Sequence, residues 1–175
     1  MDAAYFYSHI RTIPDWPETG VQFRDITPLL RDGAAFRQLI DAFAERYADA
    51  HIDAIAGIDA RGFIVGAALA YCLGCGFIPV RKAGKLPFET MSESYSLEYG
   101  AATVEVHTDA ADAGDHVLVV DDLMATGGTL LATARLMKRL GAKIVEAAVV
   151  IDLPALGGGA RLEAAGIPRF ALLTF

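Results

Sequence analysis

The chain has 175 residues, 54% of them hydrophobic and 21% charged, which is enough for one globular domain with a substantial core. Its formal net charge of −7 argues against a nucleic-acid backbone or an anionic membrane as a partner, because both require clustered Lys and Arg. The N-terminus lacks the basic start and apolar core of a signal peptide, and no run approaches the ~18 apolar residues of a membrane span. We therefore expect a cytoplasmic protein.

Apolar spacing and Gly/Pro punctuation predict an N-terminal helix over 4–13, an irregular stretch to Gly33 and then an amphipathic helix that buries Phe43. The elements expected after it are strand 54–58, helix 61–73, strand 77–81, a hairpin of 95–99 and 103–107, strand 117–120, helix 129–140, strand 144–151, helix 161–165 and strand 170–174. This order predicts an α/β fold with a mostly parallel, doubly wound sheet flanked by helices. The segment 86–94 has no apolar period and is expected to be a mobile surface loop, and 157–159 a flexible glycine loop.

Two adjacent carboxylates, Asp121 and Asp122, follow the apolar run 117–120 and precede the small residues 125–129. The run is typical of a strand covered on both faces, so the carboxylates lie at a strand–loop–helix junction, where we expect them to be exposed without a ligand. Small residues at a helix N-terminus can direct backbone N–H groups at a phosphate. Carboxylates beside it can accept from sugar hydroxyls or hold Mg²⁺, so ribose 5-phosphate fits the junction. The alternative is a capping turn without a ligand.

A second junction, at Asp59, Ala60 and Arg61, can bind another anionic group through backbone N–H groups and the guanidinium. The basic residues Arg81, Lys82 and Lys85 lie beyond the next strand, and a basic run of this kind is usually a solvated face. The motifs of P-loop NTPases and of dinucleotide-binding enzymes do not occur in the chain.

The pair Cys72 and Cys75 has the C-x-x-C spacing of redox motifs and of half a zinc site. A zinc site would need a second pair of ligands. The histidines are scattered, with none paired at ligand spacing: His9, His51, His107 and His116. We therefore expect the cysteines to be passive and to end a helix, with Gly74 as a stop signal.

Five segments are similar, in order and spacing, to the motifs of one enzyme family: 20–28, 56–63, 81–87, 94–100 and 117–129. The last resembles the phosphoribosyl-pyrophosphate (PRPP) signature of the type I phosphoribosyltransferases. Leu-Glu-Tyr-Gly at 97–100 and Val-x-Phe-Arg-Asp at 21–25 narrow the resemblance to the adenine phosphoribosyltransferases, and it covers nearly the whole chain.

The resemblance implies the type I phosphoribosyltransferase fold in a single domain over 1–175, with an N-terminal hood over roughly 1–33 and a mobile β-hairpin lid over roughly 86–106. It also implies transfer of the phosphoribosyl group from PRPP to adenine, giving AMP and pyrophosphate in purine salvage. The implied cofactor is Mg²⁺, held by Asp121 and Asp122 directly or through water and PRPP. The implied assembly is a homodimer.

The resemblance further assigns roles to individual residues. The implied catalytic residues are Glu98, Asp121, Asp122 and Arg61. The implied substrate-binding residues are Val21, Gln22, Phe23, Arg24, Thr27, Asp59, Ala60, Arg61, Arg81, Lys85, Tyr99, Ala125, Thr126, Gly127, Gly128 and Thr129. Among these, Glu98 handles the adenine proton, Phe23 stacks on the base, and a cis peptide falls between Asp59 and Ala60.

Two alternatives stay open. A transferase for another base, such as xanthine or orotate, should lack the Leu-Glu-Tyr-Gly and Val-x-Phe-Arg-Asp pieces. A non-catalytic PRPP-sensing regulator should carry a DNA-binding module or a basic surface, and this short acidic chain has neither.

Overall fold

The computed structural model describes residues 3–96 and 100–175, and contacts divide the chain into two compact units, Met1–Ala48 and Asp49–Phe175. Among the described residues, none of the helices combines the length and the apolar character that a membrane-spanning helix requires. The single domain over 1–175, with a hood and a lid at the stated bounds, stays a prediction.

The N-terminal unit contains two strands that form an antiparallel hairpin, with helices before and after it. Its elements are α1 (Ala3–Ser8), β1 (Arg11–Pro14), β2 (Gln22–Asp25), α2 (Thr27–Arg31) and α3 (Gly33–Arg46). The Asp32 carboxylate caps α3, because it accepts hydrogen bonds from the backbone N–H groups of Ala34 and Ala35, both at 2.9 Å. Phe43 is buried on this helix, as predicted.

The predicted helix over 4–13 is wrong beyond Ser8. Residues Arg11–Pro14 instead form β1, and Pro14 explains the difference because it disfavours helical backbone at the residue before it. The stretch to Gly33 is not irregular either, since it contains β2 and α2. Pro28 lies in the first turn of α2, where its fixed φ suits a helix start.

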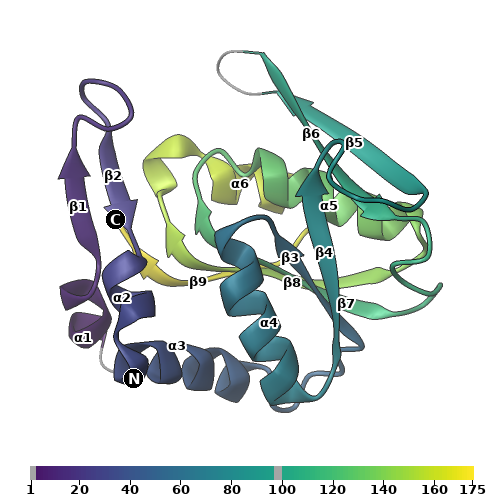
Figure 1. Cartoon of the computed structure of the whole chain (residues 1–175), viewed down its shortest axis with the longest axis horizontal. Helices are drawn as coiled ribbons and strands as arrows, with labels where there is room; N and C mark the ends of the chain where they lie inside the picture. The colour runs from purple at the N-terminus through teal and green to yellow at the C-terminus, as the bar shows by residue number, and fades with distance from the viewer. Residues whose placement is uncertain (1–2, 97–99) are drawn as a thin grey trace. The chain divides into compact units, whose positions relative to one another are not determined.

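The C-terminal unit is built on a seven-stranded sheet with the order β5-β6-β4-β3-β7-β8-β9 (Figure 1). Its strands are β3 (Ala54–Ile58), β4 (Gly76–Lys82), β5 (Thr90–Ser96), β6 (Ala101–His107), β7 (His116–Met124), β8 (Lys143–Asp152) and β9 (Arg169–Thr174). Its helices are α4 (Arg61–Leu73), α5 (Gly128–Arg139) and α6 (Gly158–Ala164), with a 3₁₀ turn at Pro154–Leu156. Strands β4, β3, β7, β8 and β9 run parallel, whereas β6 pairs antiparallel with β4 and β5.

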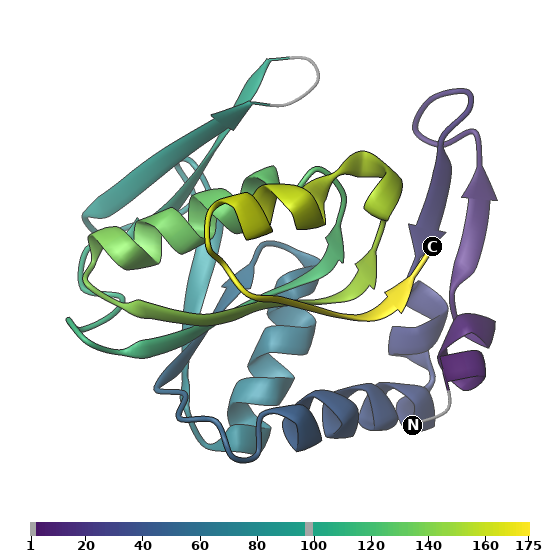
Figure 2. The same ribbon diagram turned by 180° about the vertical axis from the view of Figure 1, so that it is seen from behind.

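Helices cover both faces of this sheet: α4 lies on one face, and α5 and α6 lie on the other (Figures 1 and 2). All five residues of β3 are buried, as expected for a strand covered on both sides. The main core on the α5 side includes Val117 and Val119 of β7 and Leu130 and Leu136 of α5. The predicted α/β class, with a mostly parallel, doubly wound sheet, is confirmed.

Helix α4 ends as predicted, because Gly74 follows it in the left-handed conformation with φ 70°. Both cysteines are free: Cys72 is exposed and Cys75 is partly buried. Burial raises the pKa of the Cys75 thiol, which keeps it in the less reactive protonated form.

The predicted loop over 86–94 is wrong for its second half, because β5 begins at Thr90. Met91 and Tyr95 of this strand pack against the core, and Glu93 between them pairs with Arg135 and Arg139 of α5. A charged residue on the inward face hides the period-two pattern that would have predicted the strand.

The segment 157–159 is also not a flexible loop. Gly157, with φ 75°, precedes α6, and Gly158 and Gly159 form the buried start of that helix.

Candidate active site

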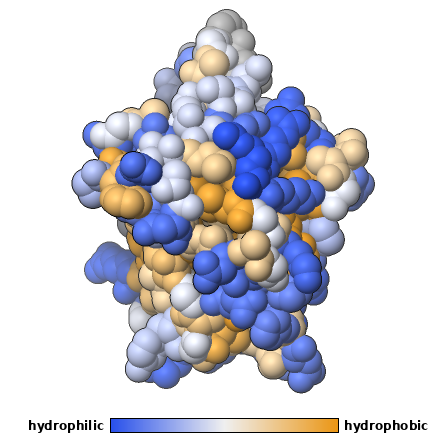
Figure 3. Space-filling model, turned by 90° about the vertical axis from the view of Figure 1, so that its right-hand side faces the viewer, coloured by the Kyte–Doolittle hydropathy of each residue, from blue (hydrophilic) through white to orange (hydrophobic). Residues whose placement is uncertain are grey.

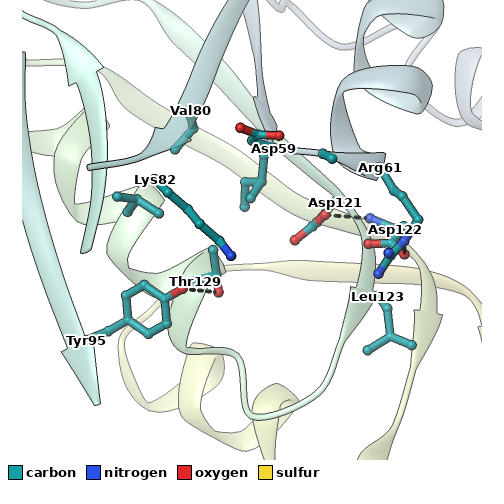
Figure 4. Close-up of a pocket in the computed structure, with 12 residues that line it drawn as sticks. Asp59, Arg61, Val80, Lys82, Tyr95, Asp121, Asp122, Leu123 and Thr129 are labelled. Atoms are coloured by element: carbon teal, nitrogen blue, oxygen red, sulfur yellow. Dashed lines mark hydrogen bonds and ion pairs between the residues drawn. The ribbon is translucent and has the colours of Figure 1, made fainter. Parts of the chain in front are cut away.

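A cavity of about 400 Å³ lies in the C-terminal unit at the carboxyl ends of β3, β4 and β7, the edge where open α/β sheets bind ligands (Figure 4). It gathers five of the predicted site residues at the two strand–helix junctions, together with Thr129. Its lining residues are Ile58, Asp59, Ala60, Arg61, Val80, Lys82, Tyr95, Val104, Asp121, Asp122, Leu123 and Thr129.

The first junction joins β3 to α4. The peptide bond between Asp59 and Ala60 is cis, as the resemblance implied, and α4 begins at the next residue, Arg61. Gly62 lets this junction approach β7 closely, since a Cβ there would lie 2.8 Å from the Val120 carbonyl oxygen and 3.0 Å from Asp121 Oδ1. The start of α4 is thereby held against the carboxylates.

Arg61 and Asp122 form an ion pair across the two junctions, in which Arg61 Nε donates to Asp122 Oδ2. The Asp122 side chain is only 8% exposed. The expectation that this carboxylate is exposed without a ligand is therefore wrong. Strand β7 continues past the pair to Met124, because it keeps pairing with β8, and this places Asp122 inside the sheet layer.

Asp121 is partly buried and also lines the cavity. Its Oδ1 accepts from the Asp122 backbone N–H at 2.9 Å. Burial, and then the neighbouring Asp122 carboxylate, raise the pKa of Asp121 well above its usual range. Two carboxylates thus share one nearby guanidinium, and the site favours the approach of further positive charge.

A smaller cavity of about 90 Å³ adjoins the first and is lined by the loop 125–129 with Asp121, Leu123, Met124 and Leu130. Gly127, with φ 74°, turns this loop into α5, whose first N–H groups have no acceptor within the helix. The five residues predicted to bind a phosphate, 125–129, therefore surround a single cavity large enough for an anion, at the N-terminus of a helix.

Gly158, at the start of α6, contacts the backbone of the loop 125–129, which we call the phosphate loop. The Gly158 backbone N–H donates to the Ala125 carbonyl oxygen at 3.1 Å. A Cβ on Gly158 would lie 2.4 Å from that oxygen and 2.9 Å from the Gly127 nitrogen. Sequence reasoning missed this role, although three consecutive glycines were the available signal.

The hairpin of β5 and β6 closes one side of the cavity. Thr129 Oγ1 donates to Tyr95 Oη at 3.0 Å, and the Tyr95 ring lies against Gly128, where a Cβ would lie 2.8 Å from Tyr95 Cδ2. Arg139 adds hydrogen bonds to the Ser92 carbonyl and to Glu93. Tyr95 is thus a site residue that sequence reasoning did not include.

The first two residues of the basic run, Arg81 and Lys82, end β4 and face opposite sides of this strand. Lys82 lines the cavity and extends toward Thr129 (Figure 4). Arg81 Nε donates to Asp59 Oδ2 at 3.1 Å, and its Nη1 donates to the Lys85 carbonyl oxygen at 3.1 Å. Arg81 therefore braces the first junction, and neither it nor Lys85 is among the residues that line the cavity.

The remaining predicted residues fall outside the described residues or belong to the N-terminal unit. Glu98 and Tyr99 are outside the described residues. Of the N-terminal set, the Phe23 ring packs edge-on against Trp16, with ring centroids 4.5 Å apart. Arg24 donates to Thr12 Oγ1, and Thr27 donates through both its backbone and its side chain to Asp25; Val21 and Gln22 are exposed.

This fold and site define a phosphoribosyltransferase. The model of the phosphoribosyl transferase domain matches residues 26–159, which include both junctions and the hairpin. The adenine phosphoribosyltransferase of Methylibium petroleiphilum is 60% identical over 174 residues, which are 99% of this chain and 89% of the relative.

Solved structures give the same result. The adenine phosphoribosyltransferase of Rhodothermus marinus superposes with a TM-score of 0.93 at 47% identity, covering 99% of this chain and 98% of the other. The Saccharomyces cerevisiae enzyme, solved with an imino-altritol bisphosphate and adenine, gives 0.92 at 39% identity and 98% coverage of both. The chain belongs to the phosphoribosyltransferase family, among the adenine phosphoribosyltransferases.

Proposed function

We propose that this chain transfers the 5-phosphoribosyl group of PRPP to adenine, giving AMP and pyrophosphate, and so serves purine salvage. The observation that carries the proposal is a pair of adjoining cavities: the first junction and the carboxylate pair line the larger one, the loop 125–129 lines the smaller one, and Asp121, Leu123 and Thr129 line both. That spacing suits a ribose with an anionic group at each end. The names of the relatives supply adenine as the base.

The leaving pyrophosphate belongs at the junction of Asp59, Ala60 and Arg61. As the bond at the anomeric carbon breaks, negative charge grows on the pyrophosphate, and cationic groups fixed in the cavity stabilise it. Arg61 and Lys82 are the cationic side chains of the described cavity lining that meet this need. Arg81, braced on Asp59, holds the junction in shape from the opposite side of the strand.

The ribose and its 5′-phosphate belong between the carboxylates and the phosphate loop. Asp121 and Asp122 accept hydrogen bonds from the vicinal hydroxyls and stabilise the positive charge that develops on the sugar. The loop 125–129 holds the phosphate through backbone N–H groups and the Thr129 hydroxyl. Held at both ends, the anomeric carbon is oriented for in-line attack.

The carboxylate pair also suits Mg²⁺. Asp121 and Asp122 are adjacent carboxyl groups, of which only Asp122 is ion-paired with Arg61, and carboxylate oxygens are the donors that this hard cation prefers. Asp121 and Asp122 would hold the ion, directly or through water and PRPP. When bound, Mg²⁺ supplies charge neutralisation to the pyrophosphate oxygens.

The residues proposed to contact adenine are assigned from the family resemblance. Glu98 would take or redistribute the proton of the attacking ring system, with Tyr99 packed nearby. Phe23 would stack on the flat base, and the backbone around Gln22 and Arg24 would read its amino group. Val21 and Thr27 are the two other residues of the N-terminal unit that we propose to bind substrate.

The assembly and location also follow from the family. We infer a cytoplasmic homodimer, in which Arg81 and Lys85 also serve the neighbouring subunit's site. Exposed apolar side chains support an association surface: Ile64 and Tyr71 on α4 are 44% and 91% exposed. Hydrophobic patches are visible among hydrophilic residues on the face drawn in Figure 3.

The test is product formation from PRPP and Mg²⁺ with adenine, hypoxanthine, guanine, xanthine and orotate measured side by side. We expect AMP from adenine and far slower turnover of the others. A preference for xanthine or orotate would instead assign the chain to another base, and PRPP binding without any product would indicate a sensor.

A further inference from the structure

A cluster of two histidines and one aspartate lies at the amino ends of the parallel strands, opposite the carboxyl ends that line the cavity. The parallel register pairs Ala54 of β3 with Val117 of β7, so the residues just before them, Asp53 and His116, are neighbours at the amino ends of these strands. His51 lies two residues before Asp53. The carboxylates of the active site lie toward the other end of β7, so the two clusters are separate.

The two rings of this cluster each face one oxygen of the same carboxylate. His51 Nε2 lies 3.2 Å from Asp53 Oδ1, and His116 Nδ1 lies 3.3 Å from Asp53 Oδ2. The rings are nearly perpendicular, with centroids 4.9 Å apart, and one ligand atom from each of the three residues lies within 4.8 Å of the others. Two ligands at about 2.1 Å in a tetrahedral zinc site are roughly 3.4 Å apart, and each ring nitrogen lies close to that distance from one oxygen of the Asp53 carboxylate.

The backbone around the carboxylate is fixed by the sheet. The Asp53 N–H donates to the His116 carbonyl at 2.9 Å, and the Gly76 N–H donates to the Asp53 carbonyl at 2.9 Å. The His116 N–H donates to Asp53 Oδ2 at 2.8 Å, which orients the carboxylate between the rings. Two of the three ligands are therefore preorganised, and His51, 73% exposed, can adjust to an ion.

We propose that His51, Asp53 and His116 form a binding site for a divalent transition-metal ion of the zinc class. Two imidazoles and one carboxylate favour Zn²⁺ or Co²⁺ over Mg²⁺ and Ca²⁺, which prefer oxygen ligands only. Partial exposure of the cluster leaves room for water at the fourth position. The spacing of the histidines along the sequence did not indicate this cluster, because the register of β3 and β7 joins residues more than sixty positions apart.

The test measures metal alone, without PRPP, on full-length protein freed of metal by chelation. Titration with Zn²⁺ in a calorimeter should show one equivalent, and Co²⁺ should give visible absorption bands of a bound ion. His51→Ala should weaken Zn²⁺ binding at least tenfold. This variant should fold normally because the side chain is largely exposed, and it should leave transferase activity unchanged.

Matched variants separate this site from other ligands. Asp53→Asn keeps an oxygen for the His116 N–H, removes the charge and should also weaken binding. His9→Ala, which removes a histidine from the other unit, and the double variant Cys72→Ser/Cys75→Ser should bind Zn²⁺ as the wild type does. Absence of saturable binding, one equivalent that stays equally tight in His51→Ala, or loss of zinc in the serine variant alone would each overturn the proposal.

Discussion

Arg61 and Asp122, sixty-one positions apart in the chain, join the first residue of α4 to the seventh residue of β7 by an ion pair at the edge of the cavity. The carboxylate is buried whereas the guanidinium side chain is 48% exposed. The pair therefore fixes the guanidinium where a ligand in the cavity can reach it, and the folded state depends on the arginine to offset a buried charge.

Arg61→Gln should reduce both stability and catalysis. The substitution removes the positive charge beside the Asp121 and Asp122 carboxyl groups. A buried polar group left without its partner lowers the free energy of unfolding by about 1–3 kcal/mol. Turnover should fall at least about tenfold, on the order of 1.4 kcal/mol, because charge on the leaving pyrophosphate is less stabilised. Thermal unfolding and steady-state kinetics check both effects.

The control for that variant is Arg37→Gln, which removes an exposed arginine of α3. It should leave melting temperature and turnover close to those of the wild type. Full activity in Arg61→Gln would remove this residue from pyrophosphate binding.

Asp121→Asn should raise the melting temperature of the free protein at neutral pH while turnover falls at least about tenfold. Burial and the Asp122 carboxylate raise the folded-state pKa of Asp121, so its ionisation opposes folding. The penalty is absent below the ordinary aspartate pKa of about 3.9, where the group is protonated in both states, and it grows as the pH rises through the raised pKa.

The measurement is thermal unfolding of wild type and Asp121→Asn between pH 4 and pH 8 without PRPP. The stability difference should widen with rising pH, and exposed Asp112→Asn should show no such trend. A variant that is less stable than the wild type at neutral pH would contradict the assigned environment of Asp121.

Glu98→Gln tests the assignment that rests on resemblance alone. The change keeps the shape of the side chain and removes its charge, so loss of proton handling should lower turnover by roughly 10²–10⁴-fold. PRPP affinity, measured by calorimetry, should barely change, because the groups proposed to bind its anionic ends lie on Arg61 and 125–129. Unaltered turnover with adenine would remove Glu98 from the site.

The two strand–helix junctions that line the cavities can be predicted from the sequence because both are local. An apolar strand, a few small residues and a helix start are contiguous in the chain, and the carboxyl ends of parallel strands meet at one edge of the sheet. The cis peptide at Asp59 and Ala60 followed from the resemblance at the same junction.

Other parts of the site were not predicted, because they depend on which side chains of a strand point into the cavity and on which strands and helices pack together. Lys82 enters the cavity, rather than Arg81, because residues two apart on a strand share a face and Val80 already points inward. The strand that carries Tyr95 was predicted to begin only at 95, because Glu93, paired with two arginines of α5, interrupts the apolar alternation of β5. The burial of Asp122 depends on pairing with β8, which no local pattern reveals.

Gly158→Ala should weaken PRPP binding although Gly158 does not line either active-site cavity. A Cβ would lie 2.4 Å from the Ala125 carbonyl oxygen and 2.9 Å from the Gly127 nitrogen, both backbone atoms of the phosphate loop, so the loop must move. We expect a rise of roughly tenfold in KM for PRPP and a loss of about 1–3 kcal/mol of unfolding free energy from overpacking.

Kinetics well below the melting temperature separate displacement of the loop from general instability, because KM for adenine should then stay close to its wild-type value. The matched control is Gly33→Ala, where no atom lies within 4 Å of the added Cβ and the backbone has an ordinary φ. That variant should keep both KM values and match or exceed wild-type stability, because alanine is the better helix former. If Gly158→Ala binds PRPP as tightly as Gly33→Ala does, α6 does not position the phosphate loop.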